Sequence, residues 1–87
     1  ISPKPKEIGT FVDNKKDGLW KYFNEKGFLI REENYFDGTI NGRWHTYYDN
    51  GNPKIEGQYL QGKRVGLWKW YDLDRKIYLE KDYKLSL

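Results

Sequence analysis

The residue types that carry out catalysis are scarce in this sequence. Histidine occurs once, as His45, and cysteine is absent. Without cysteine there is no thiolate nucleophile, no disulfide and no cysteine-type zinc site. Both serines, Ser2 and Ser86, lie near the ends of the chain, whereas a nucleophilic triad needs a hydroxyl or thiol beside an oriented base. We therefore expect His45 to be a solvent-facing strand residue rather than a catalytic base or a metal ligand.

The carboxylates also lack the arrangement of an acid–base pair. Glu32 and Glu33 are adjacent, so in a strand they point to opposite faces, whereas a glycosidase needs two carboxylates that face each other. Most aspartates fall where we expect turns, which Asp side chains commonly stabilise. Glycine-rich phosphate-binding loops are missing as well. The sequence predicts a protein that is not an enzyme and that uses no cofactor and no metal.

A 24-residue repeat positions the other residues of interest. The sequence Gly-x-Trp occurs three times at this spacing and is followed each time by further aromatic residues. A column of tyrosines recurs at the same spacing. Such regularity is the signature of tandem structural units, each too small to bury its apolar face alone. The residues expected to be structural are Gly18, Gly42, Gly66, Trp20, Trp44, Trp68, Tyr35, Tyr59 and Tyr83.

Each unit is predicted to be a β-hairpin. Alanine and methionine are absent and 18% of the residues are aromatic, which favours strands over helices. Glycines at fixed offsets supply the positive φ angles of turns, and apolar residues alternate between them. We expect short strands at 19–24, 43–48 and 67–72, longer strands at 28–36, 52–60 and 76–84, and connections at 37–42 and 61–66. The third turn has Arg75 where the other two have glycine, so we expect it to be wider or more strained.

These hairpins predict an all-β fold, a single-layer twisted antiparallel meander of about seven strands. We expect one repeat domain over residues 1–87: a partial unit at 1–17 and repeats at 18–41, 42–65 and 66–87, the last of them degenerate or capping. The three Gly-x-Trp indoles share one face, so losing the central one, Trp44, is expected to threaten the whole fold. Because the chain begins with Ile1, we expect that an upstream segment such as a signal peptide has been removed; the compartment is not indicated.

Residues 35–51 follow the pattern Tyr-x2-Gly-x3-Gly-x-Trp-x2-Tyr-x3-Gly. This pattern resembles the MORN-repeat variant family, bacterial proteins of tandem β-hairpins that include members labelled antitoxin-like. The likeness covers residues 9–84 and returns at Tyr59, Gly62, Gly66, Trp68 and Tyr71. It implies an elongated antiparallel sheet without catalytic residues. It also implies association with a protein or a phospholipid surface and, in the antitoxin-like group, neutralisation of a partner toxin.

Residues that break the repeat are the best candidates for binding. Tyr48, Trp70 and Tyr78 are aromatic where at least one other unit is not. Because the fold does not require an aromatic residue there in every unit, they could form an exposed patch, and Trp and Tyr are favoured interface anchors. Local repacking is the alternative explanation. Lys63 and Arg64 lie in an expected connection, where they could contact phosphates or simply keep a loop soluble.

The expected partner is a protein. An open sheet leaves unpaired edge strands, and the C-terminal strand has no proline to block pairing, whereas Pro3 and Pro5 precede the first strand. We therefore expect docking or self-association through the C-terminal edge. Peripheral binding to anionic membranes through the basic loop tips is the alternative. Nucleic acid is not expected, because the net charge is only +3 and acidic and basic residues alternate along the chain.

Overall fold

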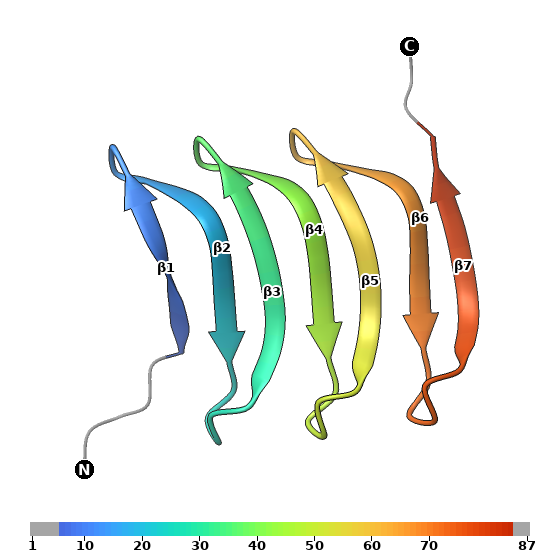
Figure 1. Ribbon diagram of the computed structural model, residues 1–87. Coiled ribbons are helices and arrows are strands. Elements are labelled where there is room, and N and C mark those ends of the chain that lie inside the picture. Colours follow the sequence, from blue (N-terminus) through green and yellow to red (C-terminus); the bar gives the residue numbers. More distant parts are fainter. Residues whose placement is uncertain (1–5, 85–87) are drawn as a thin grey trace.

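The computed structural model describes residues 6–84 and shows one seven-stranded antiparallel sheet. Its strands pair in chain order, and neighbours in sequence are neighbours in space (Figure 1). The strands are β1 (Glu7–Val12), β2 (Lys15–Phe23), β3 (Leu29–Phe36), β4 (Thr39–Tyr47), β5 (Pro53–Leu60), β6 (Lys63–Tyr71) and β7 (Ile77–Tyr83). The expected all-β meander is confirmed.

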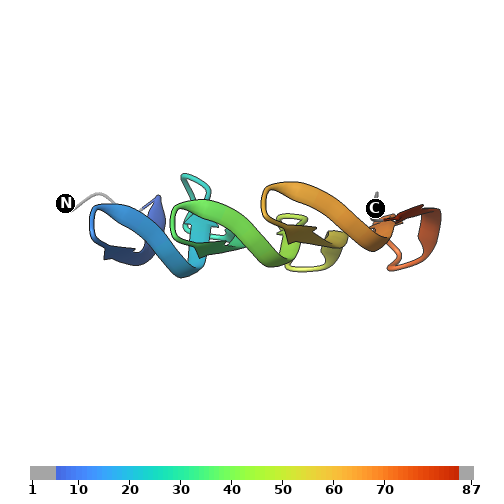
Figure 2. The same cartoon turned by 90° about the horizontal axis from the view of Figure 1, so that it is seen from above.

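The sheet is a single layer. The Cα atoms extend over 48 × 39 × 11 Å, and the view from above shows no element covering either face (Figure 2). In the described part of the chain no helix is long and apolar enough to span a membrane. Apolar burial therefore depends on side chains that lie flat along the sheet.

The strands joined at one end of the sheet turn within two residues. In the turns at Asp13-Asn14, Asp37-Gly38 and Gln61-Gly62 both residues have positive φ, the pattern of type I′ hairpins. The expected connections at 37–42 and 61–66 are therefore wrong, because β4 and β6 already begin at Thr39 and Lys63. The second and third turns also donate their glycine N–H groups to the backbone of the preceding unit, to Lys16 and Ile40.

Gly18, Gly42 and Gly66 lie inside strands rather than between them. Their φ angles are 74°, 108° and 70°, conformations that residues with a Cβ rarely adopt. In the region of Gly42 and Gly66 the strand register shifts by two residues, as at a β-bulge. Figure 1 shows β2, β4 and β6 curving near their starts, where these glycines lie. The repeated glycine thus bends a strand rather than ending one.

The turn at Arg75 keeps the geometry of the two glycine turns, so the expectation of a wider turn is wrong. Arg75 N–H donates to the Asp72 carbonyl over 3.0 Å, matching the bonds that the two equivalent glycines make. Its φ is 62°, in the left-handed region that costs most residues about 1–2 kcal/mol. The Arg75 side chain donates to the Asn52 side chain over 3.0 Å, which ties this turn to the preceding one.

The small core lies on one face of the sheet. In the described residues the buried apolar side chains are Trp20, Tyr22 and Trp68, which are 3%, 8% and 0% exposed. Strand β7 contributes little to it, because all of its residues except Tyr83 are exposed. The core is therefore local to the first and third Gly-x-Trp strands, β2 and β6.

Candidate functional site

Aromatic side chains from β2 to β7 gather on one side of the sheet, which we call the aromatic face. Trp68 lies at the centre of its larger cluster, with ring centroids 5.4 Å from Trp44 and 5.2 Å from Tyr59. Tyr83 and Trp70 follow at 6.0 and 6.1 Å. Tilted and edge-to-face pairs at these distances stabilise by about 0.5–1.5 kcal/mol beyond burial. The expected stacking of indoles and phenols across hairpins is confirmed.

Two glycines provide platforms for the buried indoles. A Cβ added at Gly9 would overlap the Trp20 ring, and one added at Gly57 would overlap the Trp68 ring. In the middle unit the equivalent position, 24 residues from each, is Glu33, which pairs directly with Trp44 across the strands. With a side chain on that platform Trp44 stays only half-buried. The 48-residue spacing of Gly9 and Gly57 was visible in the sequence, but our reading of it did not identify these platforms.

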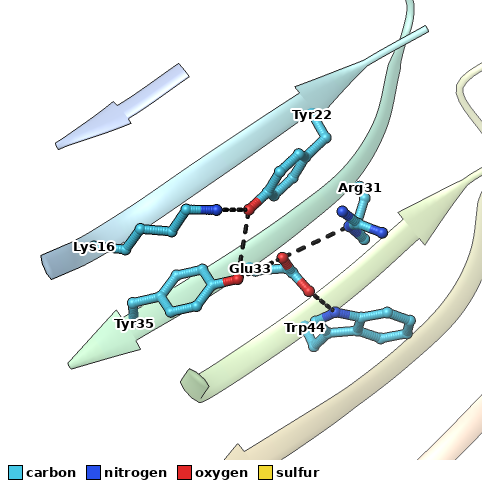
Figure 3. A network of polar contacts seen from close by, with 6 residues as sticks. All are labelled: Lys16, Tyr22, Arg31, Glu33, Tyr35 and Trp44. Atoms are coloured by element: carbon cyan, nitrogen blue, oxygen red, sulfur yellow. Dashed lines mark hydrogen bonds and ion pairs between the residues drawn. The ribbon is translucent and has the colours of Figure 1, made fainter. Parts of the chain in front are cut away.

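Glu33 is the end point of a polar network on the aromatic face. The Trp44 indole N–H donates to it over 2.8 Å and the Tyr35 hydroxyl over 2.9 Å. Because Tyr35 uses its proton for this bond, Tyr22 must be the donor in the 3.4 Å contact between the two hydroxyls. Lys16 in turn donates to Tyr22 over 2.9 Å. Figure 3 shows this directed chain running across β2 and β3, from an ammonium to a carboxylate.

The network fixes the charge of its members. Burial alone would raise the pKa of the Glu33 carboxyl, but the hydrogen bonds from Trp44 and Tyr35 outweigh it and hold the pKa below the ordinary 4.5. Arg31, whose Nε lies 3.7 Å from Glu33, acts in the same direction. Burial, followed by the hydrogen bonds with Tyr22 and Glu33, raises the pKa of Tyr35. At neutral pH the carboxylate is charged and the tyrosine is a donor.

Replacing Glu33 with glutamine is expected to destabilise the fold by about 1.5 kcal/mol at pH 7, because a charged acceptor of two buried hydrogen bonds is lost. Since the folded pKa lies below the unfolded one, the native carboxylate stabilises above about pH 4.5 and loses this contribution as the pH falls through its folded value. Urea midpoints measured from pH 7 to pH 3 should therefore decline less steeply for Glu33→Gln. Glu25→Gln, at an exposed turn position, is the control, and equal slopes for the two variants would contradict the assignment.

The aromatic residues predicted to bind a partner do not form one cluster. Trp70 belongs to the aromatic face. Tyr48 lies in the turn after β4, where its hydroxyl donates to the Tyr71 carbonyl over 2.7 Å, a bond that ties two units together. Tyr78 lies on the edge strand β7 and is 63% exposed. Their role in binding stays a prediction, and Tyr78 is the most accessible of the three.

Lys63 and Arg64 are the first two residues of β6, not part of a loop. Arg64 turns to the aromatic face: its guanidinium lies 4.6 Å from the Trp68 ring centroid and donates to the Tyr83 hydroxyl over 3.2 Å. Lys16, its equivalent in the first unit, lies 4.5 Å from the Trp20 ring in the same way. Both cations thus stabilise an indole, while Lys63 is exposed.

The opposite side, which we call the polar face, carries a ladder of alternating charge. Each member pairs with the next across the strands, and opposite charges in such positions are favourable. Behind the ladder, Tyr47 donates to Glu32, and hydrogen bonding to Glu56 raises the pKa of Tyr71 to about 12. Two of its columns repeat every 24 residues, a signal that our sequence reading missed. In order from β2 to β7 the ladder is Lys21, Glu32, His45, Glu56, Lys69 and Glu80.

Neither face assembles a catalytic group. Glu32 and Glu33 point to opposite faces, as expected, because they pair with His45 and Trp44 respectively. His45 is half-buried on β4, with its Nδ1 4.0 Å from a Glu56 oxygen, and it does not face a nucleophile in the described residues. Within residues 6–84 no three His, Cys, Asp or Glu side chains come together as metal ligands would.

The family model of the MORN repeat variant matches the chain twice, over residues 16–37 and 40–61. Searches of the curated proteins and of the solved structures found no match. The two matched segments cover half of the chain and contain the glycine bends, the Trp20 and Trp44 strands and the Glu33 network described above. The chain therefore belongs to the MORN repeat variant family, whose members are generally non-catalytic repeat proteins.

Proposed function

We propose that this chain is a non-catalytic scaffold that binds a protein partner through its C-terminal edge strand. The observation that carries the proposal is the exposure of β7, which pairs with β6 on one side and with nothing on the other in residues 6–84. Ile77, Tyr78 and Leu79 are 42%, 63% and 41% exposed. A strand with unpaired backbone groups and exposed apolar side chains is a template for strand addition.

The other edge is less suited to this role. Strand β1 is also exposed along its whole length, but its register with β2 is interrupted between Ile8 and Thr10, and irregular edges discourage pairing. The prolines expected to block it, Pro3 and Pro5, lie outside the described residues. We therefore assign docking to β7.

The partner that can be tested directly is a second copy of the chain. Size-exclusion chromatography with light scattering over a wide concentration range should show dimers, and hydrogen exchange should show protection of β7 in the dimer. Leu79→Lys should return the chain to a monomer, because it places a charge on the pairing strand, while Ile8→Lys on β1 is the matched control. A strict monomer at every concentration, or equal effects of the two variants, would count against this assignment.

Neutralising a toxin would be one specific form of this role, and the antitoxin-like members of the family motivate it. Co-expression tests it, since an antitoxin rescues growth when its partner toxin is induced. Rescue should then depend on the docking strand, and Leu79→Lys should abolish it while Ile8→Lys keeps it. Rescue that survives Leu79→Lys would place the toxin on another surface.

An exposed apolar row supports a second candidate, peripheral membrane binding. Val12, Phe36 and Leu60 end β1, β3 and β5 and are 50%, 70% and 43% exposed. Two of them pair with lysines, Val12 with Lys15 and Leu60 with Lys63. Apolar side chains flanked by cations suit an anionic lipid surface.

Vesicles of phosphatidylserine and phosphatidylcholine distinguish the two candidates by co-sedimentation. Membrane binding predicts loss of sedimentation for Lys15→Glu with Lys63→Glu, and for Phe36→Ser. Arg64 is unsuitable for this test because it holds Trp68 and Tyr83. Sedimentation that is absent, or unchanged in these variants, leaves protein binding as the function.

A further inference from the structure

The polar face is hollowed over the middle of the sheet. A depression of about 330 Å³ lies over β4, β5 and β6, and its lining includes Arg43, Gln58, His45, Glu56 and Lys69. The first two pair directly across β4 and β5, and the last three are consecutive members of the charge ladder. Its volume is at the lower end of the range of ligand sites, about 300–1,000 Å³, and suits one or two side chains of a partner.

The charges around this hollow are unbalanced. Glu56 is engaged by His45 at 4.0 Å and by Tyr71, whose pKa it raises. Arg43 and Lys69, in contrast, make no ion pair with any described residue. Arg43 is exposed and Lys69 half-buried, so two cations remain available on either side of a carboxylate that is already occupied. The hollow therefore favours an anion.

Comparison of the units shows that the fold does not need Arg43. Its equivalents in the neighbouring units are Leu19 and Leu67, which lie on strands of the same length. At the ladder position the middle unit has His45 where the others have Lys21 and Lys69. Imidazole is shorter than a lysine side chain, which leaves room above the sheet. The middle unit thus adds a cation and removes bulk at the same place.

We propose that the hollow over β4–β6 binds a carboxylate side chain of an acidic protein segment. The Arg43 guanidinium matches the two oxygens of a carboxylate, an arrangement in which arginine binds more specifically than a point charge. Lys69 adds positive charge from the far side, and the Gln58 amide supplies a neutral donor. This surface is separate from the β7 edge, so it does not depend on the edge docking proposed above.

The test is an NMR titration of the full ¹⁵N-labelled chain with a hexaglutamate peptide, with hexaglutamine as the neutral control. Binding should shift the Arg43 Nε signal and the amides of residues 43, 45, 57, 58 and 69. Arg43→Leu, which installs the residue of the neighbouring units, should weaken binding about fivefold, as expected for one exposed charge pair. Lys21→Leu removes the same charge from the same face outside the hollow and should leave the affinity nearly unchanged.

Several results would overturn this assignment. Equal weakening by Arg43→Leu and Lys21→Leu would show attraction to net charge alone, and shifts that map elsewhere would exclude the hollow. Inorganic phosphate at matched ionic strength should bind more weakly than the peptide; equal affinity would indicate a general anion site instead. If Arg43→Leu alters the circular dichroism spectrum, Arg43→Gln replaces it. Monomeric behaviour in the edge experiment leaves all these outcomes unchanged, so the two proposals fail separately.

Discussion

Replacing Trp68 with alanine is expected to unfold most of the protein at room temperature. Trp68 is 0% exposed, and its indole N–H donates to the Val65 carbonyl over 3.2 Å. Removing a buried Trp costs about 3–5 kcal/mol, while a domain of this length has a total stability of roughly 4–13 kcal/mol. Urea unfolding followed by circular dichroism should show a midpoint near zero or a strongly lowered one.

Trp44→Ala is the matched control for that experiment. Trp44 is also an indole in the 24-residue column, but it is only half-buried, so its loss should cost less than that of Trp68. This shifts the expected weak point from the central tryptophan to the third one. Equal destabilisation, or a larger effect of Trp44→Ala, would contradict the packing described for Trp68.

Replacing Gly57 with alanine is expected to destabilise the fold by about 3 kcal/mol or more. The added methyl group would overlap the Trp68 ring, and overpacking a core costs about 1–3 kcal/mol when the neighbours can move. Trp68 has little freedom to move, because four aromatic rings and Arg64 surround it. The tryptophan fluorescence of the folded variant should shift to the red as the ring becomes exposed.

Gly51→Ala separates this clash from the general cost of replacing glycine. Gly51 has a φ of 88° and open space around its missing side chain, so alanine there costs only about 1–2 kcal/mol of backbone strain. It should leave the fluorescence unchanged. If Gly51→Ala proved as damaging as Gly57→Ala, the close approach of Trp68 to the backbone would not be the reason for glycine at position 57.

The hairpin architecture was predictable because its causes are local. Seven glycines in the described residues have positive φ, and the spacing of six of them by 24 residues predicted repeated turns and bends. The alternation of apolar and polar residues predicted which side the indoles share. The identity of the bends was not predictable from local pattern, since a glycine such as Gly42 serves equally well in a turn or a bulge.

The details of the two faces depend on contacts between strands and were harder to read. Glu33 appeared as an ordinary strand carboxylate, because its role follows from pairing with Trp44 rather than from its neighbours in sequence. Arg64 likewise looked like a loop cation until β6 was seen to start before it. The columns Lys21–His45–Lys69 and Glu32–Glu56–Glu80 were already present in the sequence, and comparing charged residues between units would have found them.

The strictly sequential order of the strands bears on how such a protein can grow. Because every strand pairs only with those before and after it in the chain, inserting or deleting one 24-residue unit would leave all other pairings intact. Each inserted unit would widen the ribbon by two strand spacings, roughly 10 Å. Gene duplication could therefore lengthen this molecule in fixed steps while each existing binding surface keeps its shape.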